Sequence, residues 1–279
     1  MITATNTMSQ LQKQLDIIGN NLANIDTTGY KKRQVAFSEL LTQQFTNQPV
    51  ATQEEGRLTP NGIRQGVGAR LGNTNVNMTQ GNIKSTDREL DVAFTKANQF
   101  LQVLVEENGI QLPRYTRDGA LYLSPVAGGT NQVALVNSSG SAVLDQDGDP
   151  IIFEDNFKEL TISSNGILTV LPSEAGAPPQ TFNLSVMEVR KPQLLESVGD
   201  NLFALPNLED LGVAEEEVLV SLEGDLREQV SMQQGALEQS NVNLTTEMSD
   251  LLLTQRSYQF NAKSISISDQ MMGLINGIR

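Results

Sequence analysis

The chain has 279 residues, with 19 basic and 33 acidic side chains and a formal net charge of -14 at pH 7. This acidic balance argues against nucleic acid or an anionic membrane as a partner. The chain contains neither cysteine nor histidine. These absences exclude disulfides and thiolate chemistry, and they remove the commonest general base and metal ligand. We therefore expect no catalytic residue, cofactor, metal ion or small-molecule substrate.

The N-terminal segment predicts a helix with one narrow apolar stripe. Its apolar side chains recur at alternating steps of four and three: Ala4, Met8, Leu11, Leu15, Ile18, Leu22 and Ile25. This spacing is typical of a coiled-coil seam. Thr27-Thr28-Gly29 then predicts the helix end, with Gly29 suited to a left-handed conformation. An isolated helix of this length is marginal in water, so the stripe needs a partner in this chain or another.

The C-terminal segment, residues 244–278, contains no proline and predicts a second long helix. Its stripe on the same grid is formed by Met248, Leu251, Tyr258, Ala262, Ile265 and Met272. Gln255 and Asp269 interrupt the grid, and polar seam residues usually fix register or partner number. An ordinary helical bundle is compatible with this periodicity, but the centre of the chain offers no further long helices. We therefore predict that the two terminal helices pair as a coiled-coil-like domain.

The centre of the chain, from Arg70 to about Val220, predicts an antiparallel β domain. Short apolar runs alternate with glycine-containing turns and no helical pattern intervenes. Residues 161–163 and 167–170 form the clearest hairpin, and residues 181–189 read as one strand. The predicted class is α+β with a mainly β centre inserted between the terminal helices. The expected domains are 1–30 with 238–279 (helical), 31–70 (an extended connector) and 71–237 (β).

Three segments carry possible chemistry, each with a plainer alternative. Lys31-Lys32-Arg33 could bind an anion, but a solvated turn or a subunit contact is favoured. Gly66-Val67-Gly68 lacks the third glycine of a dinucleotide loop. Residues 145–149 have calcium-like carboxylate spacing without the later glycine and glutamate, which favours a polar turn.

A fourth candidate is the carboxylate trio Asp87, Glu89 and Asp91, which would share one face of a strand. Such a trio could hold a cation or provide a paired acid and base. The favoured interpretation is a solvated strand face.

Four segments carry distinctive motifs. Residues 20–31 contain Asn20, Asn21, Leu22, Ala23, Asn24, Gly29 and Tyr30, residues 240–248 with 255–258 form a second motif, and residues 115–119 and 196–203 lie in the interior. The first two resemble the N-terminal and C-terminal signatures of the bacterial flagellar rod and hook protein family, and the other two resemble interior segments of that family. The resemblance spans nearly the whole chain and is closest to the distal rod protein. The chain starts a few residues nearer to the asparagine motif than the family pattern does.

This resemblance implies a non-enzymatic structural subunit of the flagellar basal body. Such a subunit would assemble helically with its own copies into the distal rod, through both apolar stripes, and transmit torque to the hook. The implied partners are other rod and hook proteins and the flagellar type III export apparatus. No signal peptide is visible, so we expect export across the cytoplasmic membrane without a cleaved leader.

Two alternatives stay open. One keeps the family but places the chain in the proximal rod or the hook. The other belongs to a different class, a carboxylate-dependent glycan hydrolase. Its acid and base could come only from Asp87, Glu89, Asp91 or residues 145–149.

Overall fold

The computed structural model describes residues 2–39, 42–45, 63–66, 69–107, 109–126, 131–174, 176–199, 201–206, 208 and 212–277. The chain divides into two compact units. One, the helical unit, comprises Met1–Leu22, Arg33–Asn75 and Leu244–Arg279. The other, the β unit, comprises Ala23–Lys32 and Val76–Asn243.

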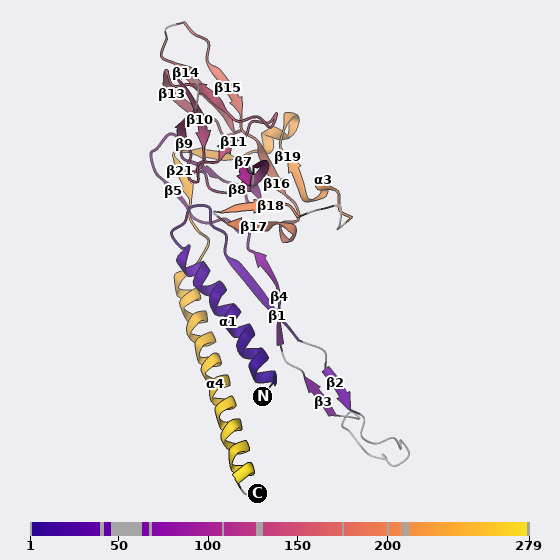
Figure 1. The fold of residues 1–279 in the computed structure, drawn as a ribbon. Helices are drawn as coiled ribbons and strands as arrows, with labels where there is room; N and C mark the ends of the chain where they lie inside the picture. The colour runs from indigo at the N-terminus through magenta and orange to yellow at the C-terminus, as the bar shows by residue number, and fades with distance from the viewer. Residues whose placement is uncertain are drawn as a thin grey trace. The chain divides into compact units, whose positions relative to one another are not determined.

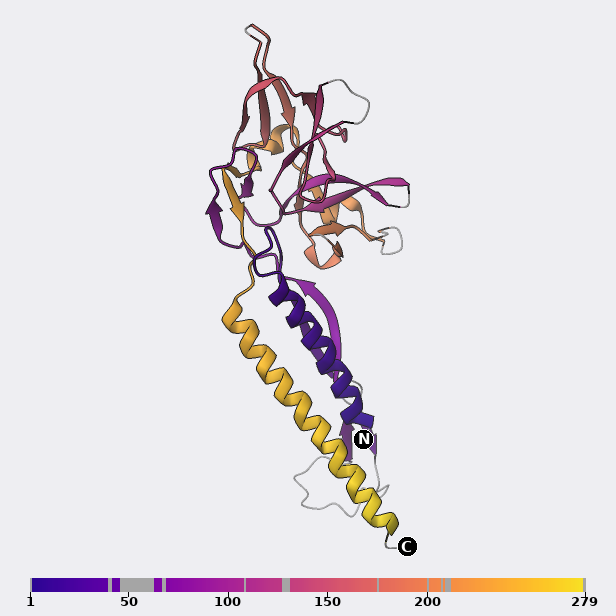
Figure 2. The same ribbon diagram turned by 60° about the vertical axis from the view of Figure 1, so that its left-hand side comes forward.

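The helical unit contains helices α1 (Ile2–Ala23) and α4 (Leu244–Gly277). They run antiparallel and lie side by side in both ribbon views (Figures 1 and 2). Helix α1 ends two residues before the predicted end, so Ile25 lies in the following turn. There the Thr27 hydroxyl donates to the Asn24 side chain at 3.2 Å, which stabilises a turn in place of a further helical residue.

Residues 31–70 were expected to form an extended connector. From Arg33 onwards they belong to the helical unit, and they contain β-strands. The strands are β1 (Arg33–Glu39), β2 (Thr42–Phe45), β3 (Ile63–Gly66) and β4 (Ala69–Val76). β1 pairs with β4, and β2 pairs antiparallel with β3. Residues 23–32, expected with the helices, lie in the β unit because their hydrogen bonds are made there: Gly29 N–H, for example, donates to the Glu238 carbonyl at 2.8 Å.

Strand β7 (Gln99–Glu107) is the centre of the main sheet of the β unit. It pairs antiparallel with β8 (Ile110–Thr116), β11 (Ala142–Val143) and β16 (Val186–Val189). The sheet also contains β9 (Tyr122–Pro125), β10 (Gln132–Val136), β12 (Ile152–Glu154), β17 (Glu196–Gly199), β18 (Leu202–Ala204) and β19 (Leu219–Ser221).

Smaller sheets complete the β unit. One is formed by β13 (Phe157–Ile162), β14 (Ile167–Pro172) and β15 (Gln180–Asn183). Two further pairs are β20 (Met232–Gln234) with β6 (Val92–Phe94), and β21 (Ala236–Glu238) with β5 (Ile83–Ser85). Short helical segments are η2 (Pro192–Leu194), α3 (Glu215–Val218) and η3 (Gly224–Gln229).

The structure tests two strand predictions. The predicted hairpin is confirmed, with Thr161 opposite Thr169 across β13 and β14. The single strand predicted over 181–189 is wrong, because the chain changes partners at Ser185. Residues before this point pair with β14, and those after it pair with β7.

Because side chains alternate across a strand, β7 contributes to two apolar cores. Leu101 and Val103 are fully buried in the first, whereas Phe100 is fully buried in the second. There Phe100 contacts Phe203 edge-on, with ring centroids 5.6 Å apart. Burying each such side chain contributes about 1.5–3 kcal/mol. The α+β class with a mainly β centre is thus confirmed.

Within the described ranges, no helix combines the length and apolar character that crossing a bilayer requires.

Candidate functional site

The segment that follows α1 and the segment that precedes α4 meet inside the β unit. Gly29 N–H donates to the Glu238 carbonyl at 2.8 Å, and Lys32 N–H donates to Asn241 Oδ1 at 2.7 Å. The Asn241 amide in turn donates to the carbonyls of Asn77 and of Thr79, at 2.9 Å each. The segments that adjoin both terminal helices are therefore hydrogen-bonded to each other and to the loop that follows β4.

A buried ion cluster lies at this meeting point; we call it the junction triad. The Glu238 carboxylate accepts hydrogen bonds from Lys31 Nζ at 2.7 Å and from Arg117 Nε at 2.6 Å. Relative side-chain exposure is 1% for Lys31, 0% for Arg117 and 2% for Glu238. Charges at this depth must be paired, because removing one partner leaves another without compensation. The triad therefore holds three distant segments in one arrangement.

Backbone groups form further hydrogen bonds with the members of the triad. Arg117 Nη1 donates to the Gln99 carbonyl at 2.5 Å, and Nη2 donates to the Lys96 carbonyl at 2.7 Å. Gly81 N–H donates to Glu238 Oε1 at 2.7 Å. The guanidinium also lies over the Phe94 ring, 5.1 Å from its centroid. These hydrogen bonds limit the cost of burying charge.

Burial and charge act against each other on these groups. Burial alone would raise the pKa of Glu238, but the charges of Arg117 and Lys31, with their hydrogen bonds, hold it below its usual range. Burial lowers the pKa of Lys31, and the Glu238 carboxylate partly offsets this effect.

This shift predicts acid sensitivity of the β unit. A carboxyl pKa that is lower in the folded state stabilises the fold above its unfolded value of 4.5, and this contribution is lost as the pH falls further. We expect the stability difference between wild type and a Glu238→Gln variant to be constant from pH 7 to about 5 and to shrink below about 4.5. Urea unfolding followed by circular dichroism at each pH measures it. A difference that persists unchanged at pH 3 would contradict this assignment.

Gly29 sits where no other residue fits. Its φ is +67°, and a Cβ placed on it would lie 2.6 Å from the Arg117 carbonyl carbon and 2.7 Å from the Asp118 nitrogen. On either side of this contact, Thr28 Oγ1 donates to Asp118 Oδ1 at 2.7 Å, and Asn201 Nδ2 donates to the Thr28 carbonyl at 2.8 Å. The glycine allows the N-terminal segment to lie directly on the turn that carries Arg117.

The residues of the asparagine motif divide between the two units. In the helical unit, Asn21 is buried and its amide donates to Glu247 Oε2 at 3.2 Å and to the Arg33 carbonyl at 2.9 Å. In the β unit, Gly29 and Tyr30 are buried. The remaining motif residues are the exposed Asn20 and Ala23 and the half-buried Leu22 and Asn24.

The predicted stripe residues differ in exposure. Leu11 and Ile18 are buried, and those half-buried are Met8, Leu15, Leu22, Ile25, Leu251, Tyr258, Ala262 and Ile265. Met248 and Met272 are exposed, at 44% and 53%. The covered face of α4 instead passes through buried Glu247 and Thr254. The C-terminal stripe is thus displaced by one residue near its start, because Glu247 turns inward to Asn21.

The sequence analysis missed the triad. It favoured a solvated turn or a subunit contact for Lys31, which is wrong because Lys31 is buried against Glu238. A signal was nevertheless present. Segments 20–31 and 115–119, which resemble the flagellar family, supply two of the triad's three members, Lys31 and Arg117, and segment 240–248 begins two residues after the third, Glu238.

The structure contradicts the predicted carboxylate trio and confirms the predicted polar turn at residues 145–149. Asp87, Glu89 and Asp91 do not share a strand face: Asp87 has a φ of +57°, and Asp91 is buried in an ion pair with Arg88 at 2.9 Å. The polar turn at residues 145–149 is confirmed, with Asp145 N–H donating to the Asp149 carbonyl. In the part of the chain that the structure describes, no group of acidic side chains could hold a metal ion. Val67 and Gly68 lie outside the described residues.

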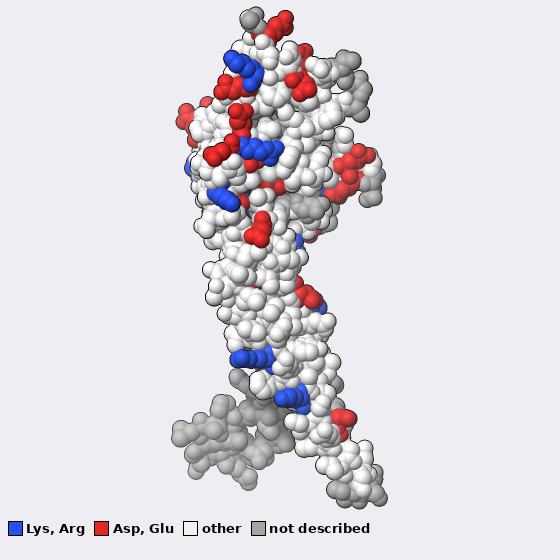
Figure 3. Space-filling view, turned by 90° about the vertical axis from the view of Figure 1, so that its left-hand side faces the viewer, with Lys and Arg blue, Asp and Glu red and all other residues white. Residues whose placement is uncertain are grey.

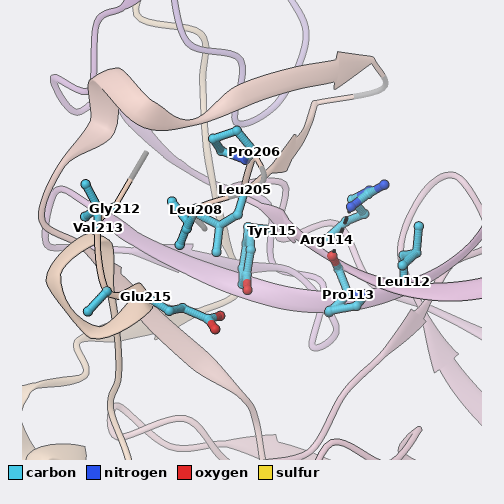
Figure 4. Close-up of a pocket in the computed structure, with 11 residues that line it drawn as sticks. Leu112, Pro113, Arg114, Tyr115, Leu205, Pro206, Leu208, Gly212, Val213 and Glu215 are labelled. Carbon is cyan, nitrogen blue, oxygen red and sulfur yellow. Dashed lines mark hydrogen bonds between the residues drawn. The ribbon is translucent and has the colours of Figure 1, made fainter. Parts of the chain in front are cut away.

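A pocket of ≈ 650 Å³ opens elsewhere in the β unit and is lined by Leu112, Leu205, Val213, Tyr115 and Glu215, among others (Figure 4). Burial, reinforced by the nearby charge of Glu215, raises the pKa of Tyr115 to about 12. Its hydroxyl therefore stays protonated at neutral pH. None of the predicted site residues lines this pocket.

Comparisons with known proteins match both ends of the chain. Residues 1–31 match the family model described as "Flagella basal body rod protein", and residues 233–278 match "Flagellar basal body rod FlgEFG protein C-terminal". The flagellar hook-basal body complex protein FlhP of Bacillus subtilis is 46% identical over 100% of this chain and 98% of its own length. The flagellar basal-body rod protein FlgG of Borreliella burgdorferi is 31% identical over 99% of this chain and 97% of its own. Lys31 and Glu238 fall within the two matched stretches.

Proposed function

Because the chain belongs to the flagellar basal-body rod protein family, we propose that it assembles helically with its own copies into the distal rod and transmits torque to the hook. It is a structural subunit, and its family is not a family of enzymes. The relatives named FlgG support the rod, and the relative named FlhP supports the hook-basal body complex more broadly. The proximal rod and the hook are therefore the alternative positions.

The junction triad is the observation that carries the mechanical part of this proposal. A shaft subunit under torque must keep the segments that adjoin its terminal helices in place. In this chain, buried charges and direct backbone hydrogen bonds hold residues 23–32 and 238–243 against each other within the β unit. Separating these segments would leave a buried charge without a partner, so small displacements of the segments are strongly opposed.

The distribution of charge supports packing of copies through the helical unit. That unit contains 8 basic and 7 acidic residues, whereas the β unit contains 11 and 26. On the face shown in Figure 3, few charged side chains lie along α4. Near-neutral surfaces can approach closely, whereas the acidic β units repel one another and favour solvent. We propose that the terminal helices pair as a coiled-coil core, and that contacts which do not close on themselves extend it into a rod.

Deleting the gene tests the function. Basal bodies isolated from the deletion strain are expected to lack the distal rod segment, and the cells are expected to be non-motile until the wild-type gene is restored. Complete rods in the deletion strain would contradict the proposal. Loss of the proximal segment as well would favour the alternative position.

The proposed export route leaves the N-terminal segment in place. Other rod and hook proteins and the flagellar type III export apparatus are the proposed partners on this route. Mass spectrometry of the chain recovered from isolated basal bodies is expected to detect peptides that cover residues 2–23. Removal of this segment from the assembled protein would argue against export without a cleaved leader.

A charge in the α1 stripe is expected to block assembly. Ile18 is 5% exposed, so Ile18→Asp would bury a carboxylate without a designed partner and cost several kcal/mol. We expect loss of rod formation in the complemented strain, while near-ultraviolet circular dichroism shows a folded β unit. Gln12→Asp, on the exposed face of the same helix, is the matched control and should assemble normally. Assembly of the Ile18 variant would remove the stripe from the proposed interface.

A further inference from the structure

The pocket of the β unit contains two polar groups that the proposed assembly does not use. Its volume of ≈ 650 Å³ falls in the range of about 300–1,000 Å³ that is typical of small-molecule sites. Three segments form its walls: the end of β8, the residues that follow β18, and the residues that lead into α3. Most of the wall is apolar, with Leu112, Leu205 and Val213 among the lining residues. The pocket can therefore enclose an apolar ligand body.

The Tyr115 hydroxyl is the first of the two polar groups. Tyr115 is 3% exposed, and its ring belongs to the second apolar core together with Phe100 and Phe203. Among the described residues, none forms a hydrogen bond with this hydroxyl, although buried polar groups in folded proteins almost always have a partner. Because the pKa of Tyr115 is raised to about 12, the hydroxyl keeps its proton at neutral pH and can both donate and accept. It is a fixed hydrogen-bonding group that lacks a partner.

The Glu215 carboxylate is the second polar group. Burial raises the pKa of Tyr115, and the charge of Glu215 adds to this effect, which requires the carboxylate to lie nearby. Figure 4 shows the Glu215 side chain extending toward the Tyr115 hydroxyl. Glu217 on the same short helix is paired with Lys191 at 2.6 Å, whereas no described residue forms an ion pair with Glu215. The pocket thus presents one uncompensated negative charge beside one hydroxyl.

Arg114 also lines the pocket, but its charge is already compensated. Its guanidinium donates two hydrogen bonds to the Glu107 carboxylate, from Nη2 at 2.8 Å and from Nε at 3.1 Å. In the close-up, this side chain lies on the other side of Tyr115 from Glu215 (Figure 4). The unpaired charge of the described wall is therefore negative, which favours a cation over an anion as the ligand.

We infer that this pocket binds a primary ammonium ion carried on an apolar chain. The ammonium group donates to the Glu215 carboxylate and to the Tyr115 hydroxyl, while the apolar chain lies against the apolar wall. A metal ion does not fit, because one carboxylate and one hydroxyl supply too few ligands. A free organic amine and a lysine side chain of another protein have this same chemistry, and the tests below separate the two sources. The inference goes beyond the proposed function and does not depend on it.

The first test measures binding of n-hexylamine to the purified full chain by isothermal titration calorimetry. We expect n-hexylamine to bind about tenfold or more tightly than n-hexanol, which has the same chain length without the charge. Shortening the amine to n-propylamine is expected to weaken binding by about fourfold for each methylene removed. Equal affinities of n-hexylamine and n-hexanol would overturn the inference.

Substitutions locate the site. Glu215→Gln is expected to weaken n-hexylamine binding about tenfold, and Tyr115→Phe several-fold, because each removes one hydrogen-bonding partner of the ammonium group. Glu216→Gln is the matched control: it changes the net charge equally at an exposed neighbouring position that does not line the pocket. Circular dichroism should stay unchanged, because Glu215 is exposed and phenylalanine keeps the ring in the core. Equal affinities of wild type, Glu215→Gln and Glu216→Gln would overturn the inference.

The last test separates the two sources in isolated hook–basal bodies. A water-soluble carbodiimide, added together with n-hexylamine, joins a carboxylate to an amine that contacts it, and mass spectrometry identifies the product. Glu215 joined to a lysine would identify a protein side chain as the occupant, and Glu215 joined to n-hexylamine would identify a site for a free amine. Modification of Glu215 no greater than that of Glu216 would overturn the inference. The binding tests use the purified chain, so their failure is distinct from failure of the proposed function.

Discussion

Replacing Glu238 by glutamine is expected to lower the transition temperature of the β unit by roughly 10 °C or more. Glutamine keeps the size of the side chain but removes the charge that compensates Lys31 and Arg117, both of which are fully enclosed. Breaking a buried ion pair from one side typically costs about 3–5 kcal/mol. Two cations would then be buried within reach of each other, which adds repulsion. Differential scanning calorimetry of the full chain measures the transition.

The control for this change is Glu217→Gln. Glu217 also forms a short ion pair, with Lys191 at 2.6 Å, but the two side chains are 61% and 38% exposed. Water screens such a pair, so its loss should leave the transition nearly unchanged. Equal effects of the two substitutions would show that burial of the junction triad does not matter for stability.

Replacing Gly29 by alanine is expected to destabilise the junction by about 2–5 kcal/mol. One part of this cost is the left-handed backbone, with φ at +67°, and the other is the clash of Cβ with the backbone of Arg117 and Asp118. Backbone atoms cannot rotate away as a flexible side chain can. Residues 23–32 must therefore shift away from the backbone of Arg117 and Asp118, and we expect both a lower transition temperature and loss of rod formation.

Gly148→Ala separates the two contributions. Gly148 has a φ of +84°, but nothing lies within 4 Å of the Cβ position. Alanine at this position carries only the cost of the left-handed backbone, about 1–2 kcal/mol of stability. A Gly29 variant that is no less stable than the Gly148 variant, and that assembles normally, would contradict the close packing of the motif on the Arg117 turn.

Local patterns in the sequence predict the secondary structure well. The three-four spacing identifies both terminal helices, and the Asn165-Gly166 turn identifies the hairpin of β13 and β14. Such signals are contained within a few neighbouring residues. They fail where the chain changes partners without changing its pattern, as at Ser185, where the alternation continues from one sheet into another.

The junction could not be predicted from local patterns, because its members are far apart in the chain. Lys31 and Glu238 are separated by 207 positions, and a charged run is normally read as solvated. The displaced stripe on α4 has a related cause. Periodicity counts apolar residues, but the buried position is Glu247, which turns inward because the distant Asn21 donates a hydrogen bond to it. Only the resemblance to the flagellar family pointed to these segments.

A cryo-electron microscopy reconstruction of isolated hook–basal bodies at side-chain resolution tests the central claim most directly. The account predicts repeated copies of this chain along the distal rod, each with Lys31 and Arg117 in contact with Glu238. A rod built without this chain would contradict the proposed function. Copies in which Lys31 and Glu238 lie apart would contradict the role of the junction triad in holding together the segments that adjoin the two terminal helices.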